Sequence, residues 1–433
     1  MCRYWRTTVV STPDNWTRIS SRRIGLARLS LERCKAAPLQ LWLDVDSVGV
    51  PPEFFDLIAP YIHNAHSLNV GSGSTPEELA QTLQNILPST PNLRSLTLAG
   101  GGPRLDFPSD PCSHLTSSLT YLYLWSTPLY PSLLRLRTLT HLTLFCRLDF
   151  HLNTFLDFLE KNLSLERAIL GLRFSQPSLQ DSRGRAPMKN RLQHLSISSG
   201  CAMSIDALIS NIAVQRGGHL KVCLCGQDAK LKDLRSVLST ARLLNPLSPT
   251  FMEYRTDYRG HTRTIRLRGP NGIFSLERWS EKEALFVEFP LLPLHDIRTF
   301  HLGRSAHHQS DSIPTVFLPL SFPNLETLVI EREIAMSYLL SVLLSDPPSS
   351  PSLKTLAFLD CRLDEGFLDE LTRFAYNRKK STSAKLRRVV IINSTGQLPP
   401  FAFIDELEEH VPVVDICLSK ELPSDLKWNG LAG

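Results

Sequence analysis

A short pattern of apolar positions, Leu-x-x-Leu-x-Leu, recurs along this chain. Its five clearest copies occupy residues 93–98, 119–124, 139–144, 325–330 and 353–358. In the last two of these copies, Ile and Phe replace the final leucine. The last two apolar positions are separated by one residue, and this period of two predicts a β-strand with one buried face. Copies that follow one another directly begin 26, 20 and 28 residues apart.

This spacing is that of a leucine-rich repeat, whose units have about 20–29 residues. The copy at residues 353–363 is nearly complete, Leu-x-x-Leu-x-Phe-x-x-Cys-x-Leu, and weaker copies begin at residues 65, 165, 192, 297, 386 and 413. Between the strands, helical spacing of apolar residues predicts helices, for example over 79–87 after the capping signature Thr75-Pro76. We therefore predict an α/β leucine-rich-repeat solenoid with a curved parallel sheet inside and helices outside.

One segment, from about residue 226 to residue 296, loses the repeat pattern. Residues 262–268 and 273–279 each alternate, and Gly269-Pro-Asn-Gly272 between them has turn chemistry. The segment is therefore predicted to contain a β-hairpin with a four-residue loop. The sequence leaves open whether this segment is an insertion or a degenerate repeat.

Composition narrows the class of protein. A chain with 42% hydrophobic and 21% charged residues is typical of a folded soluble protein, and a net charge of +5 is too small to predict nucleic-acid binding. The nine cysteines lack paired zinc-ligand spacing, so neither a metal nor a disulfide is expected, and their odd number favours a reducing compartment. No apolar run reaches the roughly 20 residues of a membrane span. We expect a cytoplasmic or nuclear protein.

The N-terminal residues differ from the repeats. Cys2-Arg-Tyr-Trp5-Arg is followed by Ser-Thr-Pro-Asp-Asn-Trp16 and then by a helical stretch to residue 33. This order resembles the second half of an F-box, and together with irregular repeats it is similar to fungal F-box-like proteins. The Leu-Pro helix and Asp-Leu segment that open an F-box have no counterpart before Cys2. The resemblance implies an N-terminally truncated F-box-like helical segment at residues 1–36 and an irregular repeat domain at residues 37–433.

Such proteins are substrate-recognition subunits of cullin–RING (SCF-type) ubiquitin ligases. The resemblance implies that Cys2, Trp5 and Trp16 face a Skp-type adaptor, while the repeats hold the protein to be ubiquitinated. The alternative is a stand-alone repeat scaffold or inhibitor without a ligase link, in which the two tryptophans only cap the first turn of the solenoid.

A candidate binding surface follows from the strand pattern. The leucines point inward, so the residues between them point onto the concave wall and form columns across neighbouring strands. These columns bring six residues into one exposed patch: Tyr121, Tyr123, Trp125, His141, Phe145 and Arg167. Exposed aromatic side chains and arginines anchor protein interfaces, so we predict a partner-binding site there. The alternative is that the irregular segment or the polar loop at 175–190 covers them.

The C-terminal strands have a plainer predicted face. Thr299, Thr327 and Thr355 share one column, followed by Arg388 and Asp415. Threonines favour strands and form an ordinary solvated sheet surface. The better partner site is therefore expected in the N-terminal half.

Motifs for catalysis are lacking in the sequence. Gly100-Gly-Gly102 follows a strand without the Gly-Lys-Ser/Thr of a phosphate loop, and there is no Gly-x-Ser-x-Gly nucleophile motif. His307 and His308 lie in a polar loop, and the acidic residues 405–409 fall on one exposed helix face. We predict a protein-binding receptor that is not an enzyme and needs no cofactor or metal.

Overall fold

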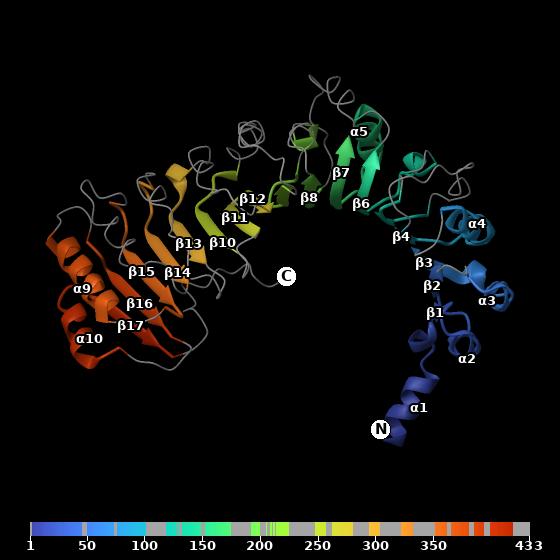
Figure 1. Ribbon diagram of the computed structural model, residues 1–433, viewed down its shortest axis with the longest axis horizontal. Helices are drawn as coiled ribbons and strands as arrows, with labels where there is room; N and C mark the ends of the chain where they lie inside the picture. The colour runs from blue at the N-terminus through green and yellow to red at the C-terminus, as the bar shows by residue number, and fades with distance from the viewer. Residues whose placement is uncertain are drawn as a thin grey trace. The chain divides into compact units, whose positions relative to one another are not determined.

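The chain forms two compact units, Met1–Gly218 (unit 1) and His219–Gly433 (unit 2), in the computed structural model shown in Figure 1. Each unit is built on an open, mostly parallel sheet with helices, as the α/β prediction requires. The residues that the structure describes are 2–45, 50–72, 76–100, 118–127, 129, 132–148, 152–174, 192–199, 205, 208–209, 211–212, 214–224, 247–256, 262–279, 294–303, 322–331, 351–361, 365–380, 385–393 and 399–418.

Unit 1 alternates strands with helices. Its strands are β1 (Arg18–Ser20), β2 (Leu39–Val45), β3 (Ala65–Ser72), β4 (Ser95–Gly100), β5 (Tyr121–Trp125), β6 (His141–Leu148), β7 (Arg167–Phe174) and β8 (His194–Ser199). Its α-helices are α1 (Arg3–Ser11), α2 (Ile24–Cys34), α3 (Pro52–Ile58), α4 (Pro76–Ile86) and α5 (Leu152–Lys161). Short 3-10 turns are η1 (Pro13–Trp16), η2 (Ile62–Asn64), η3 (Leu87–Ser89) and η4 (Leu133–Arg135).

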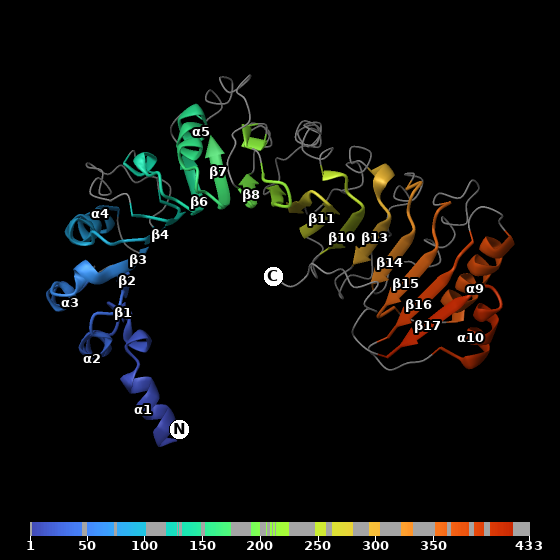
Figure 2. The same ribbon diagram turned by 180° about the vertical axis from the view of Figure 1, so that it is seen from behind.

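The strands of unit 1 pair in chain order, all parallel, from β1 to β8. The leucines of the repeat pattern stack in register, so Leu96 pairs with Leu122 and Leu122 with Leu142, and each is at most 1% exposed. Helices α2 to α5 lie on one side of the strands in both views (Figure 1 and Figure 2). The core of unit 1 is therefore the layer between the leucine face of the sheet and these helices.

A turn with a left-handed residue ends the strand in the two most complete copies of the pattern. Ser126 and Asp360 have φ angles of 53° and 50°. The residues that follow them, Thr127 and Cys361, are 0% and 5% exposed, as expected for the small residue that closes each strand phrase. The Thr127 hydroxyl donates to the Trp125 carbonyl at 3.1 Å, which satisfies a buried polar group.

Unit 2 has the strands β9 (His219–Leu224), β10 (Phe251–Thr256), β11 (Thr262–Gly269), β12 (Gly272–Trp279), β13 (Thr299–Gly303), β14 (Thr327–Glu331), β15 (Thr355–Leu359), β16 (Arg388–Ile392) and β17 (Val413–Cys417). Its helices are η8 (Leu294–Asp296), α9 (Glu365–Lys380) and α10 (Phe401–Glu408). Phe367 of α9 meets Phe358 of β15 edge to face at 5.2 Å, so the helix again covers the leucine face of the sheet.

The predicted hairpin forms β11 and β12, but two details of the prediction were wrong. The loop has two residues, Pro270 and Asn271, because Gly269 and Gly272 already pair, and Gly272 at the start of β12 has a positive φ of 142°, which favours glycine. The sheet is also not wholly parallel, since β11 runs antiparallel to both β10 and β12.

The same pairing bears on the described residues of the segment 226–296, whose nature the sequence left open. β10 follows the repeat pattern, because Met252 and Tyr254 are buried beside Phe300 and Leu302 of β13. The hairpin strands β11 and β12 enter the sheet between β10 and β9, and β12 runs parallel to β9. Among the described residues, the segment thus combines one repeat-like strand with an inserted hairpin.

The predicted register of the last strand was wrong by two residues. The match that we placed at Val413 begins at Val411, which is 1% exposed, and Ile416 pairs with Ile391. Burial of Val411 decided the register, which leaves Leu418 53% exposed. Asp415 therefore pairs with Val390, and Val413 is the residue that pairs with Arg388.

The N-terminal segment is helical, as predicted, except for strand β1. This strand pairs in parallel with β2, so the N-terminal segment at residues 1–36 joins the sheet of unit 1 directly. Ile19 at its centre is 0% exposed. Within the described part of the chain, none of the helices is long and apolar enough to cross a membrane.

Candidate functional site

Strands β5, β6 and β7 bring the six predicted binding residues onto the sheet face opposite the leucines. Tyr121 pairs with His141 and His141 with Arg167, while Trp125 pairs with Phe145. The predicted columns are therefore confirmed. We call the six residues the aromatic surface: Tyr121, Tyr123, Trp125, His141, Phe145 and Arg167.

The aromatic surface is hydrophobic at the carboxyl end of its strands. The rings of Trp125 and Phe145 lie 4.7 Å apart at an angle of 48°, within the range of favourable aromatic pairs. Phe145 continues onto Gly171 of β7, where a Cβ atom would overlap its ring. Glycine at position 171 is therefore what allows Phe145 to lie down on the sheet and support Trp125.

The other end of the aromatic surface is polar. The Tyr121 and His141 rings are 6.0 Å apart, and His141 Nδ1 lies 3.0 Å from the Thr140 hydroxyl. Burial, together with the neighbouring Tyr121, raises the pKa of the Tyr123 phenol above its usual range. Tyr123 is thus a neutral hydrogen-bonding group at physiological pH, between the polar and the apolar ends.

Two members of the aromatic surface are open to solvent. Trp125 is 47% exposed and Arg167 is also exposed. No described residue forms an ion pair with Arg167. By contrast Trp42, an aromatic residue on β2 that our prediction did not include, is covered by the Arg18 guanidinium 3.9 Å above its ring.

Mostly small side chains flank the aromatic surface. The strand before it contributes Ser95, Thr97 and Ala99 to the same columns, and the strand after it contributes His194, Ser196 and Ser198. The aromatic rings therefore project beyond their neighbours. A projecting, partly exposed tryptophan is the type of residue that contributes most to protein interfaces.

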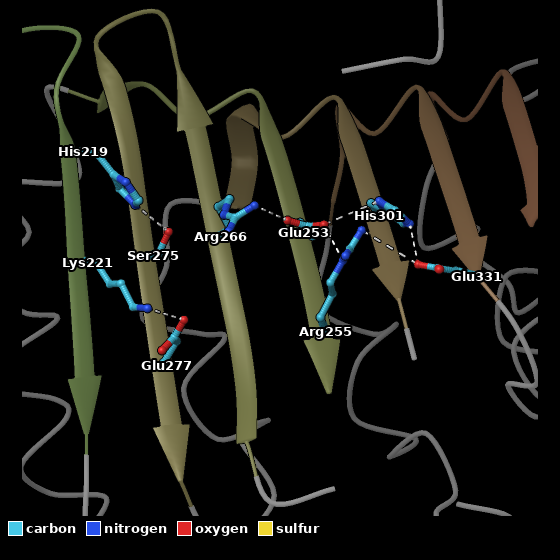
Figure 3. A network of polar contacts seen from close by, with 9 residues as sticks. All are labelled: His219, Lys221, Glu253, Arg255, Arg266, Ser275, Glu277, His301 and Glu331. Carbon is cyan, nitrogen blue, oxygen red and sulfur yellow. Dashed lines mark hydrogen bonds and ion pairs between the residues drawn. The ribbon is translucent and has the colours of Figure 1, made fainter. Parts of the chain in front are cut away.

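The corresponding face of unit 2 is occupied by charges that pair with one another (Figure 3). Glu253 on β10 is 3% exposed, and its carboxylate accepts from Arg255 at 2.6 Å and from Arg266 at 3.1 Å. His301 on β13 lies between Glu253, at 3.9 Å, and Glu331, at 3.6 Å. We call Glu253, Arg255, Arg266, His301 and Glu331 the charge network.

Two further pairs lie on the neighbouring strands β9 and β12. The Lys221 ammonium lies 2.8 Å from the Glu277 carboxylate, and His219 Nε2 lies 2.9 Å from the Ser275 hydroxyl (Figure 3). Sequence reasoning missed all these pairs. The usable signal was the charged residues two positions apart in β10 (Glu253 and Arg255) and β11 (Arg266 and Arg268), but only the strand pairing shows which charges face each other.

The rest of this face in unit 2 also differs from the prediction. We expected an ordinary solvated surface, and the threonine column is indeed only half-buried. The next column runs from His301 to Asp415, and its three middle residues Val329, Ala357 and Val390 form a buried apolar cluster with Ile392. The side chains of Arg388 and Asp415 form an ion pair at 2.6 Å, although the two residues are not partners in the strand register.

The predicted adaptor-binding residues lie at the start of unit 1. Cys2 is an exposed free thiol that precedes α1, and Trp5 lies in α1, although its side chain is outside the described part of the structure. Trp16 is half-buried: its indole donates to the Val9 carbonyl at 3.0 Å, and the Arg33 guanidinium lies 4.5 Å above its ring. Trp16 therefore joins α1 to α2.

The two helices that Trp16 joins, α1 and α2, carry exposed apolar side chains. Val9 and Val10 on α1 are 39% and 40% exposed, and Leu26 on α2 is 47% exposed.

In the described ranges, no group of three or more His, Cys, Asp or Glu side chains is arranged to hold a metal ion. A comparison of the sequence with protein-family models finds no match. A comparison with curated proteins finds no similar sequence.

Proposed function

We propose that this chain is a noncatalytic leucine-rich-repeat receptor that binds another protein on its aromatic surface. The observation that carries the proposal is the 47% exposed Trp125, which lies on Phe145 in the strand register that also presents Arg167. The exposed part of an aromatic ring contributes little to the stability of the fold, whereas covering such a ring is a main source of binding free energy.

The repeat identity is supported by the internal regularity of the chain. Leucine positions stack in register from β3 to β8, and the left-handed turn recurs at Ser126 and Asp360. Repeats of this kind present the residues between the leucines as an open surface. That geometry suits recognition of a macromolecule, since it offers a broad face.

The aromatic surface also has the composition of an interface centre. Tyrosine, tryptophan and arginine are the residues most enriched among those that dominate binding energy. Trp125 and Phe145 already support each other, so little side-chain entropy would be lost when a partner covers them. Preorganised rings of this kind favour affinity.

The test is capture of a partner by three immobilised proteins. These are the wild type, the variant Tyr121→Ala/Tyr123→Ala/Trp125→Ala, and the control Lys221→Ala/Glu277→Ala, which removes an ion pair from unit 2. We expect the wild type and the control to retain the same partner and the triple variant to lose it. Equal capture by a triple variant with an unchanged circular dichroism spectrum and melting temperature would exclude the aromatic surface.

A second candidate function is a link to a ubiquitin ligase through the N-terminal helices. The exposed Val9, Val10 and Leu26 favour it, because apolar side chains on adjoining helices are suited to contact with another helical protein. The chain would then act by holding a substrate near a tethered enzyme, which raises the effective concentration.

The ligase link is tested separately from partner binding. A purified Skp-type adaptor is mixed with the wild type and with Val10→Asp/Leu26→Asp, and complex formation is followed by size-exclusion chromatography. We expect a complex with the wild type alone. If the adaptor binds neither protein, the ligase link is rejected, and the chain remains a receptor without it.

A further inference from the structure

We propose that the aromatic surface binds an extended peptide segment with a carboxylate side chain and, four residues away, a large apolar side chain. This inference rests on the proposed function and adds the chemistry of the partner. It follows from the opposite character of the two ends of β5 to β7, and from the distance between them.

The distance between the ends matches an extended chain. Tyr121 and Trp125 point to the same face and are four residues apart on β5, which corresponds to about 13 Å at roughly 3.3 Å per residue. A peptide laid along the strand direction presents alternate side chains with the same repeat. Its residues i, i+2 and i+4 would therefore meet the three columns in order as it lies across β5 to β7, with residue i at the first column, which contains Arg167, and residue i+4 at the third, which contains Trp125.

The first column requires a negative partner. It contains the exposed Arg167 beside His141. None of the residues that β4 to β8 contribute to the three columns is acidic. A carboxylate in the partner would complete a charge-assisted pair with the Arg167 guanidinium.

The third column offers space for an apolar side chain. Trp125 is flanked on one side by Ala99, and Phe145 on its other side lies over Gly171. Trp125 is 47% exposed, so part of its ring is open to solvent. A leucine or an aromatic side chain placed there would cover that ring, and burying apolar area contributes about 25 cal/mol per Å².

A protein segment fits this surface better than a nucleic acid. Stacked aromatic rings alone would suit bases, but a nucleic acid also needs cations along its backbone, because affinity depends on several neutralised phosphates. In the three columns of β4 to β8, the described residues supply one arginine and two histidines. The proposal therefore requires one anionic group in the partner.

The experiment uses synthetic peptides of one length, each labelled with a fluorophore and built on a Gly/Ser/Thr background. Each contains one Glu and one Trp, placed two, three, four or six residues apart. Binding to the full chain is measured by fluorescence anisotropy. We expect the tightest binding at a spacing of four, with at least about 10-fold weaker binding at a spacing of three, which turns the two side chains to opposite faces.

Two exchanges test the roles of the two ends. Arg167→Gln should weaken the four-spaced peptide about 10-fold but leave its Glu→Gln analogue unchanged, because only the charged peptide loses an ion pair. Trp125→Ala should weaken both peptides. Asn69→Ala on β3, outside the three strands, is the control and should change neither affinity.

Several outcomes would overturn the inference. One is a peptide affinity that does not depend on the spacing, and another is an equal loss of affinity for the Glu and Gln peptides in Arg167→Gln. The other two are the absence of peptide binding at millimolar concentration and tighter binding of a single-stranded oligonucleotide than of the peptide. If the triple alanine variant still loses its protein partner, such outcomes reject the peptide chemistry alone. If it does not, the receptor function is rejected as well.

Discussion

The two units use the same sheet face in opposite ways. In unit 1 this face carries projecting aromatic rings and an arginine for which the described residues offer no ion-pair partner. In unit 2 it carries a buried glutamate held by two arginines, two further ion pairs, and an apolar cluster that is already buried. The charged groups on the unit 2 face pair with one another, whereas Trp125 and Arg167 on the aromatic surface are exposed and can contact a partner.

This difference separates stability from binding. A buried charge without its partner is costly, so the charge network should matter mainly for folding of unit 2. A half-exposed ring can be removed with little effect on the fold, so the aromatic surface should matter mainly for recognition. Substitutions in the two places should therefore change different measured quantities.

The largest effect is expected from Glu253→Ala. It removes two charge-assisted hydrogen bonds to a carboxylate that is 3% exposed, and each bond of this kind contributes about 1.5–3 kcal/mol to the unfolding free energy. Arg266 then lacks its carboxylate, and Arg255 keeps only Glu331, at 3.9 Å. Glu277→Ala, which breaks a partly exposed pair with Lys221, should cost at most about 1 kcal/mol. Urea denaturation measures both. Equal costs would show that the charge network is not a buried structural unit.

Trp125→Ala should have the next largest effect, on partner affinity. Loss of an interface anchor costs about 2 kcal/mol or more, or roughly 30-fold in Kd, while the unfolding free energy should change by less than about 1 kcal/mol. The matched control is Tyr376→Ala in unit 2, since Tyr376 is 41% exposed on α9. The comparison between the units fails if Tyr376→Ala weakens the partner as much as Trp125→Ala does.

Gly171→Ala is expected to displace Phe145, the residue of the aromatic surface that lies over Gly171. The new Cβ would overlap the Phe145 ring, which must move, and overpacking of this kind costs about 1–3 kcal/mol. We expect partner affinity to fall about 10-fold, corresponding to roughly 1.4 kcal/mol. In the control Gly71→Ala, the nearest atom is Asp44 Oδ1 at 3.7 Å, an ordinary contact, so affinity should not change. Unchanged affinity for Gly171→Ala would mean that Phe145 does not support the site.

The smallest effect concerns ionisation of Tyr123. Burial and the neighbouring Tyr121 raise its pKa, so the folded chain holds this proton more tightly than the unfolded chain does. The associated stability is therefore present below the unfolded pKa of about 10 and is lost as pH rises through the folded pKa. Ultraviolet titration of the wild type against Tyr123→Phe should show one phenol that ionises late. If the phenol that Tyr123→Phe removes ionises at a lower pH than the other phenols, Tyr123 is not partly buried.

The aromatic surface could be predicted from sequence because the leucines fix the register. Once Leu122 and Leu142 are known to stack, the pleat places Tyr121 and Tyr123 on the other face, and a parallel neighbour aligns them with His141. The position of Phe145 over Gly171 could not be predicted, since it depends on which way one ring turns.

The charge network could not be predicted because its strands do not follow chain order. Glu253 and Arg266 lie 13 residues apart, and their contact depends on the antiparallel pairing of β10 with β11. The register of β17 failed for a simpler reason. Val411 and Val413 both fit the apolar pattern, and only the buried core behind the sheet selects Val411.

The most direct test of where the partner binds is photo-cross-linking at two positions. A benzophenone amino acid replaces Tyr123 in one protein and Lys221 in another, and each is irradiated with the partner captured by the wild type. We expect a cross-link to the partner from position 123 and none from position 221. A cross-link from position 221 with none from position 123 would contradict the assignment of the binding site to unit 1.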